Sequence, residues 1–287
     1  MHKNLTMNTK RYLFKFFYIG SKKYYGSQRQ NGLETIEDCL INGLTIKGYI
    51  INATSSGFEV ASRTDKLVSA RGAAFSCRLE KEPILMEINS ALPRDIGIWA
   101  FTEVPDVFLS RYNAIYRYYK YILPLYYFRD GISFKLDLTA IKKGCKLTSG
   151  HHDFKNFCKN DPDVEEKTVR DLNLSVIKEG NVLIFNFKSR AYLRQQVRKI
   201  MAKLIELGKK EISLKEYSAI LDPTKHYSFP PADPNGLILW DVFYGKNLKF
   251  NIGEKSLERM REYIDKSYLY YKTRVKLFEI FQQGYFG

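Results

Sequence analysis

The sequence has few of the residues that build metal centres and redox centres. Four cysteines and four histidines occur in 287 residues, and no two cysteines have the two-residue spacing of a zinc site or a redox pair. The cysteines are typical of small buried hydrophobic residues. No predicted strand is followed by a glycine-rich phosphate loop or a Walker-type motif. We therefore expect neither a metal nor a cofactor.

Long apolar runs are also missing, and acidic residues are in the minority. No run approaches the roughly 18 apolar residues of a membrane span, and the first residues lack the pattern of a signal peptide, so we expect a cytoplasmic protein. Lys and Arg number 46 against 31 Asp and Glu, a net charge of +15. A basic surface attracts polyanions, and the 15% of aromatic residues offer rings on which bases stack. The composition favours nucleic acid as the partner.

The first half of the chain alternates between strand and helix patterns. Aromatic side chains with a period of two predict a strand over 11–19, and Thr35 with Asp38 predicts a capped helix over about 35–47. Further patterns predict two strands, at 57–61 and 69–77, then a helix beginning at Pro83 and a strand over 96–101. The predicted order is β-α-β-β-α-β.

The second half repeats this order less regularly. The patterns predict a strand over 116–123, a helix over 136–145, a hairpin of 169–177 with 182–189, helices after 193 and 213, and a strand over 237–243. We predict an α+β fold of two tandem ferredoxin-like (RRM-like) halves, with antiparallel sheets side by side, helices outside and a catalytic cleft between the halves. The predicted domains are residues 1–108, residues 109–250, and a basic helical extension over 251–287.

Asp65 is the only carboxylate in a polar turn between two short apolar runs, 58–61 and 69–77. Taken alone, an aspartate between two strands most often closes the turn through its own backbone. A carboxylate that two strands hold on a loop also suits a reactive group, as general base or as nucleophile. Arg63, two residues earlier, adds a cation beside it.

Three other stretches have a related character. Basic and aromatic residues are interleaved from Ala114 to Leu123, around Tyr119, and two arginines one helical turn apart, Arg194 and Arg198, lie between Ala191 and Ile200. The loop Tyr25-Gly26-Ser27-Gln28-Arg29-Gln30 is the third stretch. Together with Ser62-Arg63-Thr64-Asp65, these stretches resemble the TruA family of tRNA pseudouridine synthases, in order and spacing, from about residue 12 to residue 244.

The resemblance implies an enzyme that isomerises uridine to pseudouridine in the anticodon stem-loop, at positions 38, 39 and/or 40 of tRNA. It implies that Asp65 is the catalytic aspartate, that Arg198 pairs with it, and that Tyr119 stacks on the target base. Arg63 then matches the arginine that fills the space of the flipped nucleotide. A homodimer is also implied. Which positions are modified, and whether Asp65 acts as nucleophile or base, stays open.

Two residues depart from the family pattern. Leu67 stands where a glycine is expected, and Ser27 stands where many members have tryptophan. If the backbone at residue 67 needs a positive φ, a leucine there costs on the order of a kcal/mol.

Basic side chains near these stretches are candidates for contacts with RNA phosphates. They are Lys22, Lys23, Arg29, Arg71, Arg117, Arg190 and Arg194. Two other functions fit part of the pattern. A non-catalytic RNA-binding protein would have the same RRM-like topology but would leave Arg198 without a role. A metal-free glycosidase would need a second carboxylate near the motifs, and the sequence singles out none.

Overall fold

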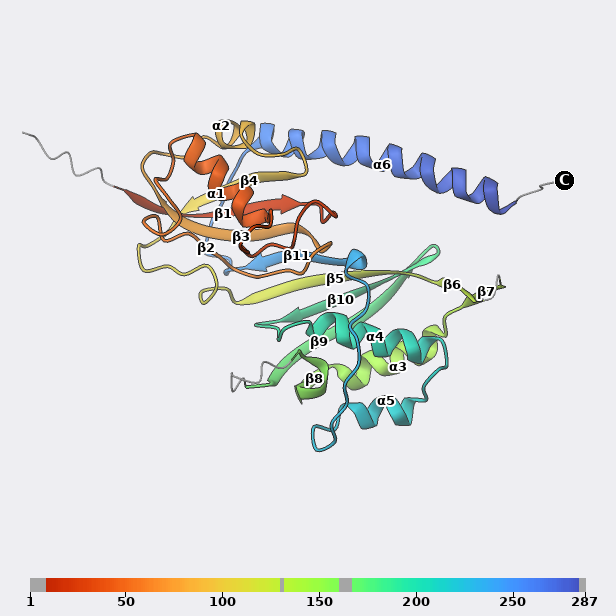
Figure 1. Ribbon diagram of the computed structural model, residues 1–287. Helices are drawn as coiled ribbons and strands as arrows, with labels where there is room; N and C mark the ends of the chain where they lie inside the picture. Colours follow the sequence, from red (N-terminus) through yellow and green to blue (C-terminus); the bar gives the residue numbers. More distant parts are fainter. Residues whose placement is uncertain (1–8, 130–131, 160–166, 284–287) are drawn as a thin grey trace, which may run out of the picture.

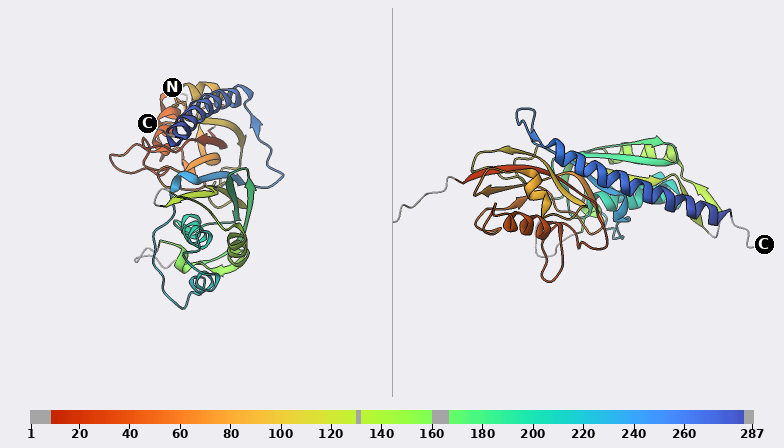
Figure 2. Two further views of the ribbon diagram at one scale, coloured as in Figure 1. Left: turned by 90° about the vertical axis from the view of Figure 1, so that its right-hand side faces the viewer. Right: turned by 90° about the horizontal axis from the view of Figure 1, so that it is seen from above.

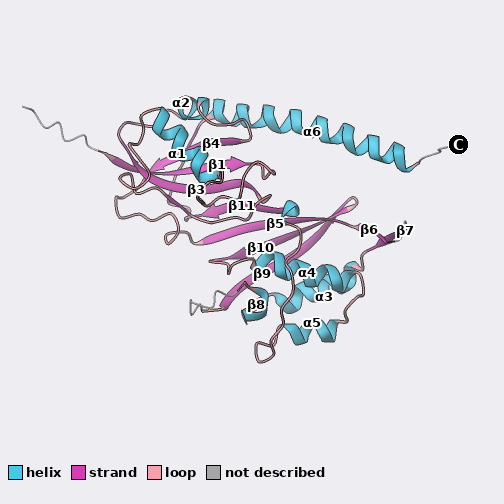
Figure 3. Ribbon diagram, in the orientation of Figure 1, coloured by secondary structure: helices cyan, strands magenta, loops and turns pink. Residues whose placement is uncertain are grey.

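The computed structural model describes residues 9–129, 132–159 and 167–283. These residues form an α+β structure in which the strands make a band through the middle of the molecule and the helices lie around it (Figures 1 and 3). Within this part of the chain, no helix is both long enough and apolar enough to span a membrane.

The N-terminal half has the predicted order of elements. Strand β1 (Lys10–Tyr18) pairs antiparallel with β3 (Ser69–Leu79) on one side and with β4 (Ile96–Glu103) on the other, and the short β2 (Glu59–Val60) pairs with β3. Helix α1 (Ile36–Ile46) follows β1, and α2 (Leu85–Ser90) precedes β4. The helix predicted over 35–47 is thus confirmed, and its capping box of Thr35 and Asp38 is present.

The C-terminal half is built in a similar way. Its sheet contains β5 (Tyr116–Pro124), β8 (Gly150–Asp153), β9 (Val169–Glu179), β10 (Val182–Ser189) and β11 (Leu237–Phe243). Its helices are α3 (Leu138–Thr148), α4 (Gln196–Gly208) and α5 (Leu214–Ile220), with short 3₁₀ turns η1 (Lys155–Phe157) and η2 (Pro234–Gly236). A separate hairpin of β6 (Tyr126–Arg129) and β7 (Ile132–Lys135) was not predicted.

The two halves share one sheet, whereas the sequence patterns predicted two sheets side by side. In the described residues, ten strands join in the order β12-β4-β1-β3-β11-β5-β10-β9-β8, with β2 beside β3. The junction is a short parallel pairing of β11 with β3, at Ile238 with Ser69 and Leu239 with Ala70, and the other pairings are antiparallel. Local periodicity does not report such a pairing, because its partners lie about 170 residues apart in the sequence. Through it, the loop before β3 comes close to the second half.

Strand β1 is buried on both faces. On one face Phe14 stacks on Phe75, with ring centroids 4.7 Å apart. On the other face Lys15 is buried and forms an ion pair with Asp241 at 2.5 Å. The sequence predicted a strand with one aromatic face, and the second buried face arises because the chain after β11 returns over it, with Tyr244 and Phe250 near the Lys15 ammonium.

The chain ends in a long helix, α6 (Glu254–Gln282), after the short strand β12 (Asn251–Ile252). The helical character predicted for this extension is confirmed. Its first turns pack on β4 and α2 through Ser256 and Arg259, and its second half extends past the body of the protein (Figures 1 and 2). All four cysteines are buried, as their scatter along the sequence predicted.

Candidate active site

Asp65 lies on the loop between β2 and β3, at the junction of the two halves. The amide N–H of Val68 donates a hydrogen bond to the carbonyl oxygen of Asp65 at 3.2 Å, which closes a tight turn. Leu67, inside this turn, has a φ of +72°. Leu67 therefore adopts the left-handed conformation that the glycine expected from the resemblance would favour.

Neighbouring segments fix the loop that carries Asp65. The Tyr18 hydroxyl lies 2.7 Å from the Thr64 hydroxyl, and the Thr64 amide donates to Ser27 Oγ at 2.8 Å. The Ser27 amide donates back to the Thr64 carbonyl at 3.1 Å. Ser27 is only 3% exposed, so the residue that departs from the family pattern holds the backbone next to Asp65.

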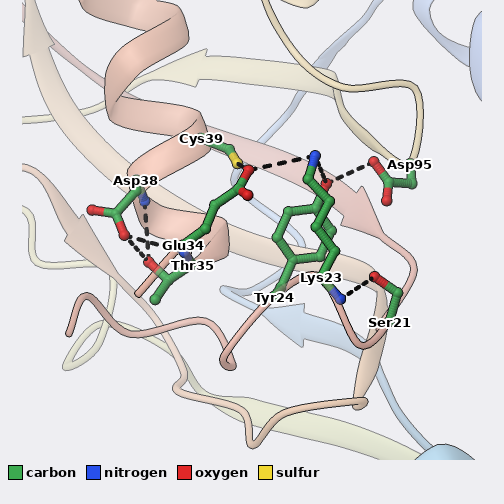
Figure 4. A network of polar contacts seen from close by, with 8 residues as sticks. All are labelled: Ser21, Lys23, Tyr24, Glu34, Thr35, Asp38, Cys39 and Asp95. Carbon is green, nitrogen blue, oxygen red and sulfur yellow. Dashed lines mark hydrogen bonds and ion pairs between the residues drawn. The ribbon is translucent and has the colours of Figure 1, made fainter. Parts of the chain in front are cut away.

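Two glycines let the preceding loop approach this turn. A Cβ at Gly20 would lie 2.3 Å from the Leu67 carbonyl oxygen, and one at Gly26 would lie 2.9 Å from the Thr64 carbonyl oxygen. The loop is anchored in turn at its other side, as Figure 4 shows: the Tyr24 hydroxyl donates to Asp95 at 2.8 Å. The Asp65 turn therefore rests on a rigid neighbour.

Arg198 reaches Asp65 from the other half of the molecule. It lies in the first turn of α4, which begins after Gln195 in a left-handed conformation, and its Nη1 forms an ion pair with Asp65 Oδ2. Its Nε donates to the Ala232 carbonyl at 2.8 Å, which fixes the guanidinium group. The side chains of Arg198 and Asp65 are 12% and 39% exposed, so the pair is partly shielded and the carboxylate stays accessible.

Tyr119 lies on β5 beside this pair and is 8% exposed. Its ring meets the edge of Tyr192 with centroids 5.0 Å apart. Burial raises the pKa of the Tyr119 hydroxyl to about 12, with a small further rise from the charge of Asp65 and opposing effects of Arg117 and Ser62. The phenol is therefore neutral at physiological pH. The structure thus brings together three residues that the sequence predicted for the site, Asp65, Tyr119 and Arg198.

Arg117 was predicted to contact RNA phosphates, but the structure gives it a different role. It is 8% exposed and is enclosed by protein acceptors. Its guanidinium donates to Ser62 Oγ at 2.9 Å and to the carbonyl oxygens of Ala61, Arg111 and Arg190. Ala61 and Ser62 lead into the Asp65 loop, and Arg190 precedes α4. Arg117 therefore ties together the two segments that carry Asp65 and Arg198, and we correct its assignment to a structural one.

The other predicted basic residues are exposed. Arg63 lies next to the Asp65 turn, and Lys23 forms an ion pair with Glu34 at 3.4 Å. Arg71 lies on β3, and its guanidinium stacks on Trp240. The remaining exposed candidates are Lys22, Arg29, Arg190 and Arg194.

Two contributors to the site were not predicted as such. Tyr192 packs on Tyr119, and burial raises the pKa of its hydroxyl well above its ordinary value. Ser62 accepts a hydrogen bond from Arg117 and contacts the Tyr119 hydroxyl. Both residues stood inside the stretches that were recognised, but only their contacts reveal what they do. Among the described residues, no group of three or more His, Cys, Asp or Glu side chains is placed to hold a metal ion.

The arrangement joins a fixed, accessible carboxylate, a paired guanidinium and a neutral aromatic ring. A carboxylate in this state acts as a nucleophile or general base, and the Tyr119 ring lies buried beside it. Since Asp65 and Arg198 belong to different halves, the site exists only where the halves meet.

Comparisons with known proteins identify related enzymes. A sequence profile of tRNA pseudouridine synthases matches residues 145–245. The chain is 31% identical to tRNA pseudouridine synthase A of Methanosphaera stadtmanae, over 93% of this chain and 96% of that protein. It is 31% identical to the enzyme of the same name from Archaeoglobus fulgidus, over 96% and 98% of the two chains. It is 34% identical to tRNA pseudouridine synthase A of Thermococcus sibiricus, over 90% of this chain and 96% of that protein.

These matches, together with the site, define an isomerase that acts on tRNA. More narrowly, the chain belongs to the tRNA pseudouridine synthase A family.

Proposed function

We propose that the protein converts uridine to pseudouridine in the anticodon stem-loop of tRNA, at positions 38, 39 and/or 40, and that Asp65, Arg198 and Tyr119 are its catalytic residues. The observation that carries this proposal is the ion pair between Asp65 and Arg198, which joins the two halves of the chain at an accessible carboxylate.

The reaction breaks the bond between C1′ and N1, turns the uracil while it stays bound, and joins C1′ to C5. C5 then loses its proton, and N1 takes up a proton, so the uracil is isomerised without a change of oxidation state. Asp65 supplies the carboxylate that this chemistry needs near the ribose, as nucleophile or as base. Arg198 holds that carboxylate in position, because its own guanidinium is fixed by the Ala232 carbonyl. No step requires oxidation or reduction of the base.

Tyr119 contributes its ring. A target base in a stacked stem or loop must be flipped out, at a cost of about a few kcal/mol, and stacking on an aromatic ring returns roughly 1 to 3 kcal/mol. Since the pKa of Tyr119 is raised to about 12, its phenolate is scarce at neutral pH. The neutral phenol ring of Tyr119 would thus hold the flipped base beside Asp65.

Basic residues around the site would hold the RNA. Arg63, exposed beside the Asp65 turn, would occupy the space that the flipped nucleotide leaves. The exposed side chains Lys22, Lys23, Arg29, Arg190 and Arg194 would bind phosphates along the same surface.

The strand order supports two ferredoxin-like units in tandem. In the first half the sheet runs β4-β1-β3-β2, and in the second it runs β11-β5-β10-β9, so both follow the order fourth, first, third, second. We assign residues 1–108 and 109–250 to these two domains and residues 251–287 to an extension. We also place the protein in the cytoplasm, where tRNA is its substrate.

We propose that the protein acts as a homodimer, and the second half of α6 supports this. Five of its exposed apolar side chains have the alternating three- and four-residue spacing of a coiled-coil seam: Ile264, Tyr268, Tyr271, Val275 and Phe278. Such a seam on an exposed helix is normally covered by another protein surface. A second copy presents the same seam, so the two helices would pack against each other.

The choice of position is tested with tRNA transcripts that carry uridine at only one of positions 38, 39 and 40. Pseudouridine is mapped in each transcript after incubation with the protein. We expect conversion at one or more of these positions and none elsewhere in the anticodon stem-loop. Conversion only outside the stem-loop would contradict the proposed substrate site.

The oligomer is tested by light scattering during gel filtration. The unchanged protein should have the mass of two chains, and the seam substitution Val275→Glu should shift it toward the mass of one. Thr273→Glu, on the same helix but off the seam, serves as the control and should leave the mass unchanged. An unaltered dimer in Val275→Glu would remove α6 from the interface.

A further inference from the structure

One face of the sheet carries cations and aromatic rings that the active site does not use. Along β5 the side chains alternate, so Arg117, Tyr119 and Tyr121 are buried toward the site and the helices, while Tyr118 and Lys120 point to the opposite face. Together with neighbours on β3, β10 and β11, these residues form the rear patch, which consists of Arg71, Tyr116, Tyr118, Lys120, Lys188 and Trp240.

The rear patch is built from stacked pairs of cation and ring. Trp240 is 38% exposed, and two cations lie over it: the Arg71 guanidinium at 4.8 Å and the Lys120 ammonium at 4.9 Å from the ring centroid. The Lys188 ammonium lies 4.2 Å from the Tyr116 ring and 5.6 Å from the Tyr118 ring. Long cationic side chains above rings are typical of surfaces that bind both phosphates and bases.

Charge on this face is strongly unbalanced. The four strands β3, β5, β10 and β11 contain a single acidic residue, Asp241, and Lys15 already pairs with it. Within the described parts of the chain, Arg71, Lys120 and Lys188 have no carboxylate at ion-pair distance. Three cations therefore share a surface on which no carboxylate of the described residues pairs with them.

The rings are placed to receive successive bases. In the pairing of β11 with β5, Asp241 lies opposite Tyr118, so Trp240 and Tyr118 come from adjacent strands. Adjacent strands are about 4.8 Å apart, and a sheet face with aromatic residues on neighbouring strands stacks two or three unpaired bases in other RNA-binding domains.

We propose that the rear patch is a second RNA-binding surface, which takes an unpaired RNA segment separate from the nucleotide bound at Asp65. The occupant must be a polyanion with flat rings, which excludes a second copy of this chain. A two-fold contact through this face would bring the three cations of one copy close to those of the other, and these like charges would repel each other. The segment belongs either to the tRNA that is being modified or to another RNA, and the experiments below distinguish the two.

Binding is measured by the fluorescence of Trp240, since the chain has only two tryptophans. The Trp99→Phe variant leaves Trp240 as the single reporter and is titrated with an unstructured eight-nucleotide RNA. We expect the emission to be quenched, and the affinity to fall steeply with salt, because phosphate contacts release counterions. Unchanged emission at saturating RNA would overturn the proposal.

A charge variant separates specific binding from general attraction to a basic protein. In the Trp99→Phe background, Lys120→Gln with Lys188→Gln should weaken oligonucleotide binding at least about tenfold and lower its salt dependence. Lys142→Gln with Lys143→Gln removes the same charge from an exposed part of α3 and should change binding less than about twofold. An equal loss of oligonucleotide affinity in the two double variants would contradict a dedicated binding surface.

Tritium release from tRNA labelled at uracil C5 identifies the source of the RNA. The Lys120→Gln/Lys188→Gln variant should react normally with an isolated anticodon stem-loop. If KM rises for whole tRNA but not for the isolated stem-loop, the bound segment belongs to the same tRNA. If the kinetics with both substrates are unchanged while oligonucleotide binding is lost, the segment belongs to another RNA. If this variant no longer reacts with the isolated stem-loop, the rear patch is not separate from the active site and the proposal is wrong. The fluorescence result stands apart from the proposed function, because it requires no turnover.

Discussion

Leu67, two residues after Asp65, occupies a backbone conformation that glycine usually takes. The sequence raised this conflict, since a glycine was expected there, but it left open whether the loop changes its path. The φ of +72° shows that the leucine adopts the left-handed conformation that a glycine there would favour. The leucine therefore carries strain that is compensated by the hydrogen bonds of Thr64 to Tyr18 and Ser27.

Leu67→Gly should relieve this strain. We expect the free energy of unfolding to rise by up to about 1 kcal/mol, because the left-handed conformation costs a non-glycine residue about 1 to 2 kcal/mol and glycine loses part of that gain through its flexible unfolded state. Urea unfolding measures the change. Leu67→Ala keeps the strain and serves as the control, so a Leu67→Gly variant less stable than Leu67→Ala would be contrary to this interpretation.

Arg117 shows where residue-level prediction failed. An arginine in a basic, aromatic strand next to a predicted site suggests a phosphate contact, and only the alternation of β5 in three dimensions shows that this side chain faces inward. Its partners, the backbone oxygens of Ala61, Arg111 and Arg190, could not be read from sequence, because backbone acceptors leave no trace in residue types.

Replacing Arg117 by methionine should therefore impair catalysis rather than RNA binding. Without the guanidinium, the segments bearing Asp65 and Arg198 lose a common anchor, and small misplacements of catalytic groups are expensive, so kcat should fall at least about tenfold. KM for tRNA should stay within about twofold. Steady-state kinetics at two salt concentrations test this, with Arg190→Met as an exposed comparison. A raised KM with unchanged kcat would return Arg117 to the phosphate contacts.

At the scale of elements, periodicity predicted most strands and helices, but it did not predict their long-range pairing. The strand of residues 237–243 was expected, whereas its parallel contact with β3 was not. Burial on both faces of β1 was missed for the same reason. Lys15 lies on the face of β1 opposite the predicted aromatic face, and the later chain covers it.

The ion pair of Lys15 with Asp241 ties β1 to β11 and hence the two halves to each other. Asp241→Ala leaves a buried ammonium group with the Val242 carbonyl as its remaining acceptor, and should lower the free energy of unfolding by about 2 kcal/mol. The double variant Lys15→Met/Asp241→Ala should recover part of this loss, since burial lowers the pKa of Lys15 and so opposes its charged form.

Urea unfolding of the single and double variants measures both effects. Glu103→Ala removes a partner of comparable chemistry from the exposed pair with Lys10 and should cost less than about 0.5 kcal/mol. A double variant less stable than Asp241→Ala alone would show that the lysine stabilises the fold without its partner.

At the scale of the whole molecule, many tyrosines are buried, and alkaline pH should therefore destabilise the protein. Burial raises the pKa of Tyr119 and Tyr121 to about 12, and it raises that of Tyr18 and Tyr244 further. Between about pH 10, where exposed phenols ionise, and about pH 12, the unfolded chain binds fewer protons than the folded one. Stability is therefore fully present below about pH 10 and is lost as the pH rises through that window.

Urea midpoints at pH 8, 10 and 11 test this prediction, together with the absorbance of tyrosinate near 295 nm. We expect the midpoint to fall from pH 10 to pH 11, and part of the tyrosine absorbance to appear only on unfolding. A midpoint that rises over this interval would have the wrong sign for buried phenols.

We expect Asp65, held by Arg198 across the junction of the two halves, to carry out the isomerisation of uridine in tRNA. The most direct measurement is the release of tritium from tRNA labelled at uracil C5, for the unchanged protein and for Asp65→Asn, with tRNA affinity measured in parallel. Our prediction is release by the unchanged protein and none by Asp65→Asn, at nearly equal affinity for tRNA. Release by Asp65→Asn at the unchanged rate would contradict it.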